Sequence, residues 1–265
     1  MPPQTHRFVL PCPPGDAELL AARLWAAGAV GVWERPDELV AWFDEPVADV
    51  PDGGRWETEP DRDWQAEWKA TITPVRAGRF TVVPSWLADT YRAEPDEDVI
   101  VLDPGRAFGS GHHATTTLCL ELLDGLELAG RRVADVGCGS GVLAIAAARR
   151  GAGVVAVDID ADAVAVTREN AAVNGVRLDV RHGGVQMLDG PVDVLVANLL
   201  TDTVAELADG LVGAAYGTLV VSGVTAERRA VALGPLQEAG MDLLEVRERD
   251  GWIAVHGRAT GPDRQ

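Results

Sequence analysis

The chain has 265 residues, 47% of them hydrophobic, and carries a formal net charge of -18 at pH 7. This length and apolar content suffice for one large domain, or for a medium-sized domain with a small one. The acidic balance disfavours a protein that grips nucleic acid through its phosphates, so we expect no direct nucleic-acid binding. A basic protein partner would suit the charge better through electrostatic steering, although the charge can equally serve solubility alone.

The three cysteines, Cys12, Cys119 and Cys138, form no C-x-x-C pair. This count and spacing disfavour a disulfide framework and a structural zinc site. The first residues lack a basic region followed by an apolar run, and no apolar stretch is long enough to cross a membrane. We therefore expect a cytoplasmic protein that does not engage a membrane.

Residues 1–56 are predicted to form a small α+β domain, followed by a linker helix at 57–72. The expected elements of the domain are strands at 6–10, 30–34 and 39–43, a helix at 16–27, and a loop at 46–54. Seven of the eight tryptophans lie between Trp25 and Trp86. This distribution fits packing in the core and at a domain interface or, alternatively, a partner-binding face.

The most informative stretch is a short apolar run, 133–136, followed by the glycine turn Gly137-Cys-Gly-Ser-Gly141. The run is typical of a buried strand in a parallel sheet. Glycines let the backbone turn sharply and come close to a ligand. The alanine-rich segment 142–148 continues at helix length, so the N–H groups of the helix start point at whatever fills the turn.

A second predicted strand, 154–157, ends at Asp158. This acid lies about 20 residues past the glycines, where nucleotide-binding folds place a carboxylate for ribose hydroxyls. The dinucleotide fingerprint is G-x-G-x-x-G, whereas this chain has the shorter G-x-G-x-G. The shorter form resembles the first motif of S-adenosylmethionine-dependent methyltransferases; the alternative is a tight turn without a ligand.

A second glycine-rich stretch, 103–117, opens a helix that is predicted to run from about 115 to 125. His112 and His113 invite the idea of a metal site, but adjacent side chains rarely point the same way and no third ligand has suitable spacing. We therefore predict no metal and interpret the stretch as a loop that covers a ligand.

Strands and helices alternate through the rest of the chain. Helices are expected at 160–174, 201–215 and 226–239, and strands at 178–181, 192–197, 218–221, 243–247 and 252–255. This order predicts an α/β domain at 73–258 with a doubly wound, mostly parallel sheet and a terminal antiparallel hairpin. Residues 259–265 are expected to be a disordered tail.

Five motifs together resemble the ribosomal protein L11 methyltransferase family over nearly the whole chain. They are Asp63-Trp-Gln-Ala-Glu-Trp-Lys69, Phe108-Gly-Ser-Gly-His-His-Ala-Thr-Thr116, Asp135-Val-Gly-Cys-Gly-Ser-Gly141, Val157-Asp-Ile-Asp160 and Val196-Ala-Asn-Leu-Leu200. The resemblance implies a class I methyltransferase fold, S-adenosylmethionine as cofactor, and an N-terminal domain that recognises the substrate. The implied substrate is a basic ribosomal protein, methylated at lysine side chains and at its N-terminal amine. We separately expect the enzyme to be a monomer.

The resemblance also assigns site residues. Asn198 follows the predicted strand 192–197, and its amide oxygen could accept a hydrogen bond from the acceptor amine and orient it; alternatively it only caps the next helix. Asn198 is therefore the expected catalytic residue. The residues expected to bind the cofactor are Thr116, Gly137, Gly139, Gly141, Asp158, Asn198, Phe108, Gly109, Gly111, His112 and Gly184.

Three other functions stay open. The first is a methyltransferase for another protein, an RNA or a small molecule. The second is a nicotinamide-dependent oxidoreductase, which the G-x-G-x-G spacing and the terminal hairpin disfavour. The third is a protein that binds S-adenosylmethionine as a sensor without turnover.

Overall fold

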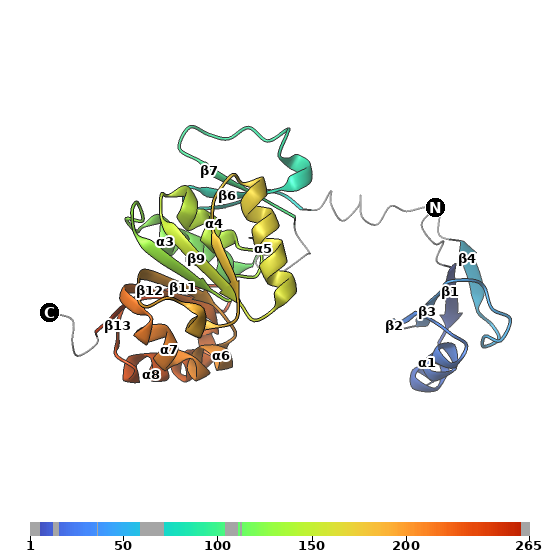
Figure 1. The fold of residues 1–265 in the computed structure, drawn as a ribbon. Coiled ribbons are helices and arrows are strands. Elements are labelled where there is room, and N and C mark those ends of the chain that lie inside the picture. The colour runs from blue at the N-terminus through green and yellow to red at the C-terminus, as the bar shows by residue number, and fades with distance from the viewer. Residues whose placement is uncertain are drawn as a thin grey trace. The chain divides into compact units, whose positions relative to one another are not determined.

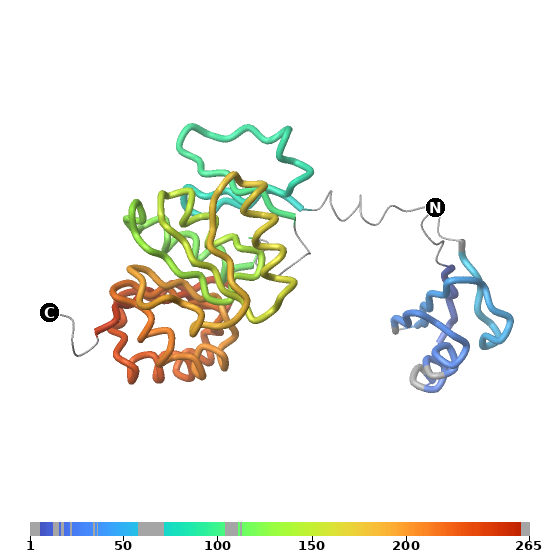
Figure 2. The backbone as a smooth tube through the Cα atoms, in the orientation of Figure 1, coloured from blue at the N-terminus to red at the C-terminus, as the bar shows by residue number. Residues whose placement is uncertain are grey.

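The computed structural model of the protein divides the chain into two units, Met1–Ile72 and Thr73–Gln265 (Figure 1). The residues that the structure describes are 6–12, 16–35, 37–58, 72–103, 111 and 113–260, and most of the others are grey in Figure 2.

In its described residues, the first unit is a four-stranded antiparallel sheet with one helix, which agrees with the predicted small α+β fold. Its elements are β1 (His6–Pro11), α1 (Ala17–Ala26), β2 (Gly31–Glu34), β3 (Glu38–Phe43) and β4 (Arg55–Thr58). The strand order is β2-β3-β1-β4. Strand β4 was not predicted, and it extends this unit beyond the expected boundary at residue 56. The remainder of the predicted linker helix, apart from Ile72, lies outside the described residues.

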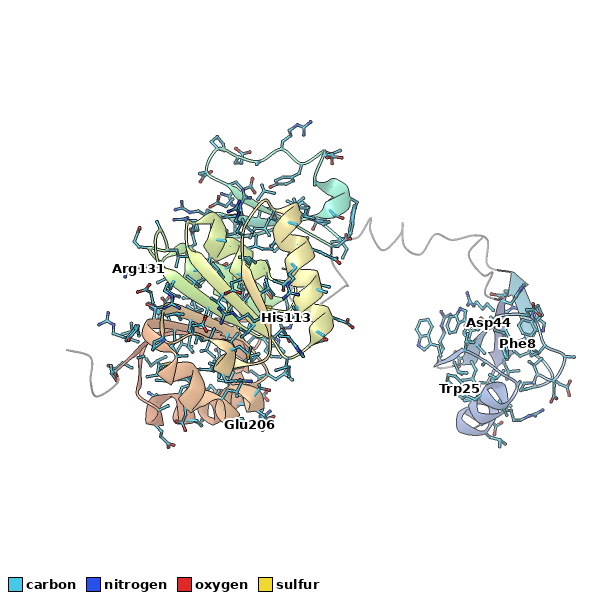
Figure 3. All side chains as sticks on the ribbon, viewed as in Figure 1. Phe8, Trp25, Asp44, His113, Arg131 and Glu206 are labelled. Carbon is cyan, nitrogen blue, oxygen red and sulfur yellow. The ribbon has the colours of Figure 1, made fainter. Side chains whose placement is uncertain are left out.

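The core of the first unit lies on one face of the sheet. Phe8 of β1 and Phe43 of β3 are buried there together with Leu24 of α1. The Trp56 ring of β4 packs against both phenylalanines, with ring centroids 5.0 Å from Phe8 and 5.1 Å from Phe43. Figure 3 labels Phe8 in this core. The Trp56 ring therefore joins β4 to the core, in addition to the antiparallel pairing of β4 with β1.

A seven-stranded sheet of order β10-β9-β8-β11-β12-β14-β13 organises the second unit. Its strands are β8 (Arg132–Val136), β9 (Gly153–Asp158), β10 (Asp179–His182), β11 (Val192–Asn198), β12 (Ala215–Thr225), β13 (Met241–Arg249) and β14 (Trp252–Ala259). The first five in spatial order pair in parallel, and β14 is antiparallel to both of its neighbours. The predicted doubly wound, mostly parallel sheet with a terminal antiparallel hairpin is confirmed.

Helices cover both faces of this sheet (Figure 1). One face carries α3 (Ala114–Asp124), α4 (Val142–Arg149) and α5 (Ala161–Val173); the other carries α6 (Thr201–Glu206), α7 (Ala208–Gly213) and α8 (Arg229–Glu238). Val194 and Val196 of β11 face the first layer, whereas Leu195 and Ala197 face the second. A strand buried on both faces reads as a continuous apolar run, which is why the sequence predicted it.

Two expectations about this unit were wrong in detail. The single helix expected at 201–215 is interrupted at Leu207, whose φ of -95° and ψ of 3° are not helical. The expected disordered tail does not begin at residue 259, because Ala259 is buried in β14 and pairs with Met241. Residues 261–265 lie outside the described part of the chain.

A three-stranded sheet precedes the large one. It contains β5 (Val75–Ala77), β6 (Phe80–Pro84) and β7 (Asp98–Leu102) in the order β5-β6-β7. A long connection, 85–97, which begins with the 3-10 helix η1 (Ser85–Leu87), joins β6 to β7 (Figure 2). The Asn174 side chain after α5 pairs with the outer edge of β7, accepting from the Val101 N–H at 2.8 Å and donating to the Val101 carbonyl at 2.7 Å. This bond pair fixes the strand that leads into residues 104–110.

Strand β8 carries a buried carboxyl group at Asp135, which is 1% exposed. Its Oδ2 accepts the N–H of Ala144 in the first turn of α4 at 3.0 Å, and its Oδ1 has no hydrogen-bond partner among the described residues. Burial raises the pKa of Asp135 to about 7, opposed by the Ala144 hydrogen bond and assisted by the charge of Asp158. Folding therefore favours the protonated form of this acid.

Asp135 should make folding stability fall as the pH rises. Its folded pKa of about 7 lies above the usual 3.8, so the folded state binds more protons than the unfolded state between these values. The contribution of Asp135 to stability should be highest below pH 4, fall by up to about 4 kcal/mol toward pH 7, and then level off. Urea unfolding of wild type and Asp135→Asn across this range measures the difference. The same pH dependence in both proteins would contradict the prediction.

A glycine in β12 leaves room for the backbone of Leu199, which directly follows the neighbouring strand β11. Gly223 lies in a β-bulge with φ +84°, and a Cβ added there would lie 1.9 Å from the carbonyl oxygen of Leu199. We expect Gly223→Ala to lower the free energy of unfolding by about 1–3 kcal/mol, because strain and collision add. The control is Gly234→Ala in α8, where an added Cβ meets nothing within 4 Å; it should gain about 0.5–1 kcal/mol. Denaturant unfolding of both variants distinguishes the two effects, and a fully stable Gly223→Ala would refute the collision.

Candidate functional site

A cavity of about 490 Å³ lies at the carboxyl ends of the central parallel strands. Strand order reverses between β8 and β11, and open α/β sheets bind ligands in the crevice at such a point. The volume suits a small-molecule site. The lining residues are His113, Thr115, Val136, Gly137, Gly139, Asp158, Ile159, Gly183, Gly184, Asn198, Leu199, Leu200, Thr203, Leu207, Gly223 and Trp252.

The glycine turn after β8 has the left-handed backbone that only glycine adopts easily. Gly137 has φ +76°, and a Cβ added to it would lie 2.3 Å from Cδ2 of Leu199. Gly139 also has positive φ and lines the cavity beside it. Gly141 does not line the cavity; it precedes α4, and an added Cβ would lie 2.8 Å from the methyl group of Thr167. Two glycines therefore shape the cavity, and the third permits close helix packing.

The Asp158 carboxylate at the end of β9 is fixed against the glycine turn. Its Oδ2 accepts the N–H of Gly139 and its Oδ1 accepts the N–H of Asp160, both at 2.9 Å. The next strand is joined at the same point, because Gly183 donates its N–H to the Asp158 carbonyl at 2.7 Å. Each carboxylate oxygen keeps a further lone pair for a ligand hydroxyl. Asp158 thus has the position and the free acceptor capacity that a ribose site requires.

Asn198 presents an amide at the end of β11. Its Nδ2 donates to Oγ1 of Thr116 at 3.4 Å, and its Oδ1 is buried without a hydrogen-bond partner among the described residues. A buried polar atom without a partner costs about 1–3 kcal/mol, so it fits a ligand that donates a hydrogen bond. Thr116 is fully buried in α3 and supports Asn198 from behind, whereas its neighbour Thr115 lines the cavity.

His113 and Trp252 form a wall of the cavity that the sequence analysis did not identify. The His113 side chain caps α3 by accepting the Thr115 N–H, and its ring makes an edge contact with Trp252, with centroids 4.8 Å apart. Figure 3 labels His113 near the start of α3. Trp252 begins β14, and Arg249 ties this hairpin to α3 through Glu121 at 3.0 Å. No sequence spacing links these residues, because only the tertiary fold brings them together.

The other predicted site residues divide into two groups. Gly184 lines the cavity, and Gly111 is buried with φ +87° where an added Cβ would lie 2.8 Å from Val82. Phe108, Gly109 and His112 lie outside the described residues. Their predicted contacts with a cofactor stay predictions.

Other kinds of chemistry find little support in the described residues. Burial raises the pKa of both the Cys119 and Cys138 thiols to about 12, which disfavours a thiolate nucleophile. No three His, Cys, Asp or Glu side chains in the described ranges gather as a metal site. Among the described helices, none has the length and apolarity to span a bilayer. The cavity instead combines a nucleotide-type carboxylate, a glycine turn and an amide.

Comparisons with known proteins agree with this geometry. The profile of the family "Ribosomal protein L11 methyltransferase (PrmA)" matches residues 36–260. A ribosomal protein L11 methyltransferase of Symbiobacterium thermophilum is 38% identical over 251 residues, covering 92% of this chain and 82% of that protein. The Deinococcus radiodurans protein of the same name is 40% identical over 242 residues, covering 84% and 86%.

A solved structure gives the same result. The ribosomal protein L11 methylase of Lactobacillus delbrueckii subsp. bulgaricus superposes with a TM-score of 0.67 at 30% sequence identity. The match covers 72% of this chain and 100% of that one. The doubly wound sheet with its terminal hairpin is therefore the class I methyltransferase fold. Since the profile match spans most of the sequence, the chain belongs to the ribosomal protein L11 methyltransferase family.

Proposed function

We propose that this S-adenosylmethionine-dependent protein methyltransferase methylates amine nitrogens of ribosomal protein L11, at lysine side chains and at the N-terminal amine. Family membership supports the substrate. The observation that favours an amine as the methyl acceptor is Oδ1 of Asn198. This oxygen is buried, has no hydrogen-bond partner among the described residues, and belongs to a residue that lines the cavity. An attacking amine carries N–H groups that such an oxygen can accept.

The residues of the cavity fit S-adenosylmethionine. Asp158 keeps lone pairs for two ribose hydroxyls. Gly137 and Gly139 line the cavity without a side chain, so a ligand can lie close to the backbone there. When bound, S-adenosylmethionine supplies a methyl group on a positively charged sulfur. The chain's own residues then have to bring an amine to that methyl group in a reactive form.

The acceptor must be a neutral amine, yet a free lysine has a pKa near 10.4 and is mostly protonated at neutral pH. The apolar side chains of Leu199, Leu200 and Trp252 line the cavity, and desolvation by such walls lowers the pKa of an entering lysine. Asn198 accepts one N–H and turns the nitrogen lone pair toward the methyl carbon. With the cofactor bound, attack of the amine nitrogen on the methyl group would break the carbon–sulfur bond, and the proton released from the amine would pass to water.

The substrate is expected to dock on the first unit as well. Trp25 and Trp33 are 52% and 53% exposed there, and the Arg35 guanidinium lies 4.3 Å from the centroid of the Trp33 ring. Tryptophan and arginine are enriched at binding hot spots, and the net charge of -18 attracts a basic protein. We propose that these residues contribute to the docking surface, and that the enzyme acts as a monomer in the cytoplasm, where ribosomal proteins are made.

Methyl transfer to purified L11 tests the proposed function. The protein, L11 and methyl-labelled S-adenosylmethionine are incubated and the modified residues are located by mass spectrometry. We expect label on lysine and N-terminal amines of L11, and none on other small basic ribosomal proteins used as controls. Intact cofactor binding without label on L11 would refute the substrate and indicate another protein, a small molecule or a sensor function.

Asn198→Ala should keep the fold and lower methyl transfer about 100-fold, because the amine loses the group that orients it. Initial rates at saturating substrate measure the loss, and cofactor affinity is measured separately by calorimetry. Thr116→Val removes only the partner of Nδ2, so it should cost less than Asn198→Ala. Wild-type turnover in Asn198→Ala would remove this residue from the mechanism.

A further inference from the structure

The wall formed by His113 and Trp252 closes the cavity at the end opposite to Asp158. Asp158 ends β9, whereas Trp252 begins β14, and β8, β11 and β12 lie between these two strands. Because β14 runs antiparallel to β12, its first residue lies at the same edge of the sheet as the carboxyl ends of the parallel strands. The acid that ends β9 marks the ribose end of such a site. The wall therefore lies on the side of Asn198 that is left for the acceptor amine.

A tight hairpin turn connects Trp252 to an arginine outside the cavity. Asp250 and Gly251 join β13 to β14, and their φ angles of +51° and +75° are both positive, as in the two-residue turns that favour hairpins. Arg249 and Trp252 are register partners across this turn. Side chains of directly opposed residues lie on the same face of a strand pair. The position of Trp252 is therefore coupled to that of Arg249 through a two-residue turn.

Helix α3 presents a row of three side chains to this face of the hairpin. His113, Thr117 and Glu121 follow each other at four-residue spacing, which places them along one side of the helix. The ring of Trp252 contacts the first of them, with centroids 4.8 Å from each other. Arg249 contacts the other two: Nη1 donates to Oγ1 of Thr117 at 3.1 Å and to Oε1 of Glu121 at 3.0 Å, and Nη2 donates to Oε2 of Glu121 at 3.3 Å. The hairpin is thus attached to three successive turns of α3.

The pair formed by Arg249 and Glu121 fixes an orientation as well as a distance. Two N–H groups of a planar guanidinium bind the two oxygens of one carboxylate, which defines the angle between the two side chains. Both side chains are partly exposed, and such ion pairs contribute little to stability. The consequence of this pair is therefore sought in the position of the hairpin. Small displacements of positioning groups are costly to a reaction that requires alignment.

We propose that Arg249 is a positioning residue for methyl transfer: its guanidinium holds the β13–β14 hairpin on α3 and thereby keeps Trp252 against His113 on the acceptor side of the cavity. Arg249 is not among the described residues that line the cavity, so it acts through Trp252 and does not touch the acceptor itself. The effect on catalysis rests on the proposed amine acceptor, whereas the effect on the position of Trp252 does not depend on any substrate.

Fluorine NMR of the full chain labelled with fluorotryptophan tests the position of Trp252 without a substrate. The Trp252 resonance is assigned by its absence in Trp252→Phe. Arg249→Ala should shift or broaden this resonance, because the indole loses its fixed place beside His113. The control is Arg247→Ala on the same strand, whose 2.6 Å ion pair with Glu245 stays within β13; it should leave the resonance in place. An unchanged Trp252 resonance in Arg249→Ala overturns the proposal.

Kinetics with L11 test the effect on the reaction. Arg249→Ala should lower kcat/KM for L11 about 10-fold, because the acceptor meets a displaced wall. The Kd of S-adenosylhomocysteine, measured by calorimetry, should stay within about twofold of wild type, because Asp158 and the glycine turn are unchanged. Arg247→Ala should keep the wild-type rates. Denaturant unfolding confirms that each variant is folded.

A double-mutant cycle separates an action through Trp252 from an independent one. If Arg249 acts through the indole, Trp252→Leu combined with Arg249→Ala should be no slower than Trp252→Leu alone. Losses that multiply in the double variant would overturn the proposal, as would wild-type kcat/KM in Arg249→Ala. Absence of L11 methylation by wild type would instead refute the proposed substrate, and the Trp252 resonance would still decide whether Arg249 positions this side chain.

Discussion

The end of β11 fits into the centre of the sheet only because both neighbouring strands lack a side chain beside it. A Cβ at Gly137 would lie 2.3 Å from the Leu199 side chain, and one at Gly223 would lie 1.9 Å from the Leu199 carbonyl oxygen. Leu199 is thus seated between the β8 turn and the β12 bulge, with its N–H bonded to Ser222 at 3.0 Å. This seating fixes the backbone of Asn198. The glycine turn therefore shapes the cofactor cavity and the position of the amide at once.

Two carboxyl groups near the turn have opposite surroundings. Asp135 is 1% exposed with one oxygen lacking a partner in the described residues, and its pKa is raised to about 7 by burial. Asp158 lines the cavity and accepts two backbone N–H bonds. The first supports the start of α4, and the second is available to a ligand. Of these two aspartates, Asp135 thus supports the fold and Asp158 is available to the site.

The sequence predicted those parts whose signal is local. Buried parallel strands appear as apolar runs, and Gly137 and Asp158 occupy spacings set by the nucleotide-binding geometry. Strand β4 was not predicted because Arg55-Trp-Glu-Thr58 has only one core residue. Strand β5 was not predicted because it is only three residues long. His113 and Trp252 could not be paired from sequence, since their contact depends on the hairpin closing against α3. Local pattern thus predicts elements and motifs, whereas walls built from distant elements need the fold.

The chemistry of the cavity leaves positioning and desolvation as the sources of rate. Among the described lining residues only Asp158 and His113 are ionisable, and both already accept backbone N–H groups. In the proposed reaction on a lysine, the net charge of -18 attracts the protonated form of the side chain, whereas methyl transfer needs the neutral amine. The apolar walls around Asn198 would resolve this conflict, because they disfavour charge only where the amine would meet the methyl group.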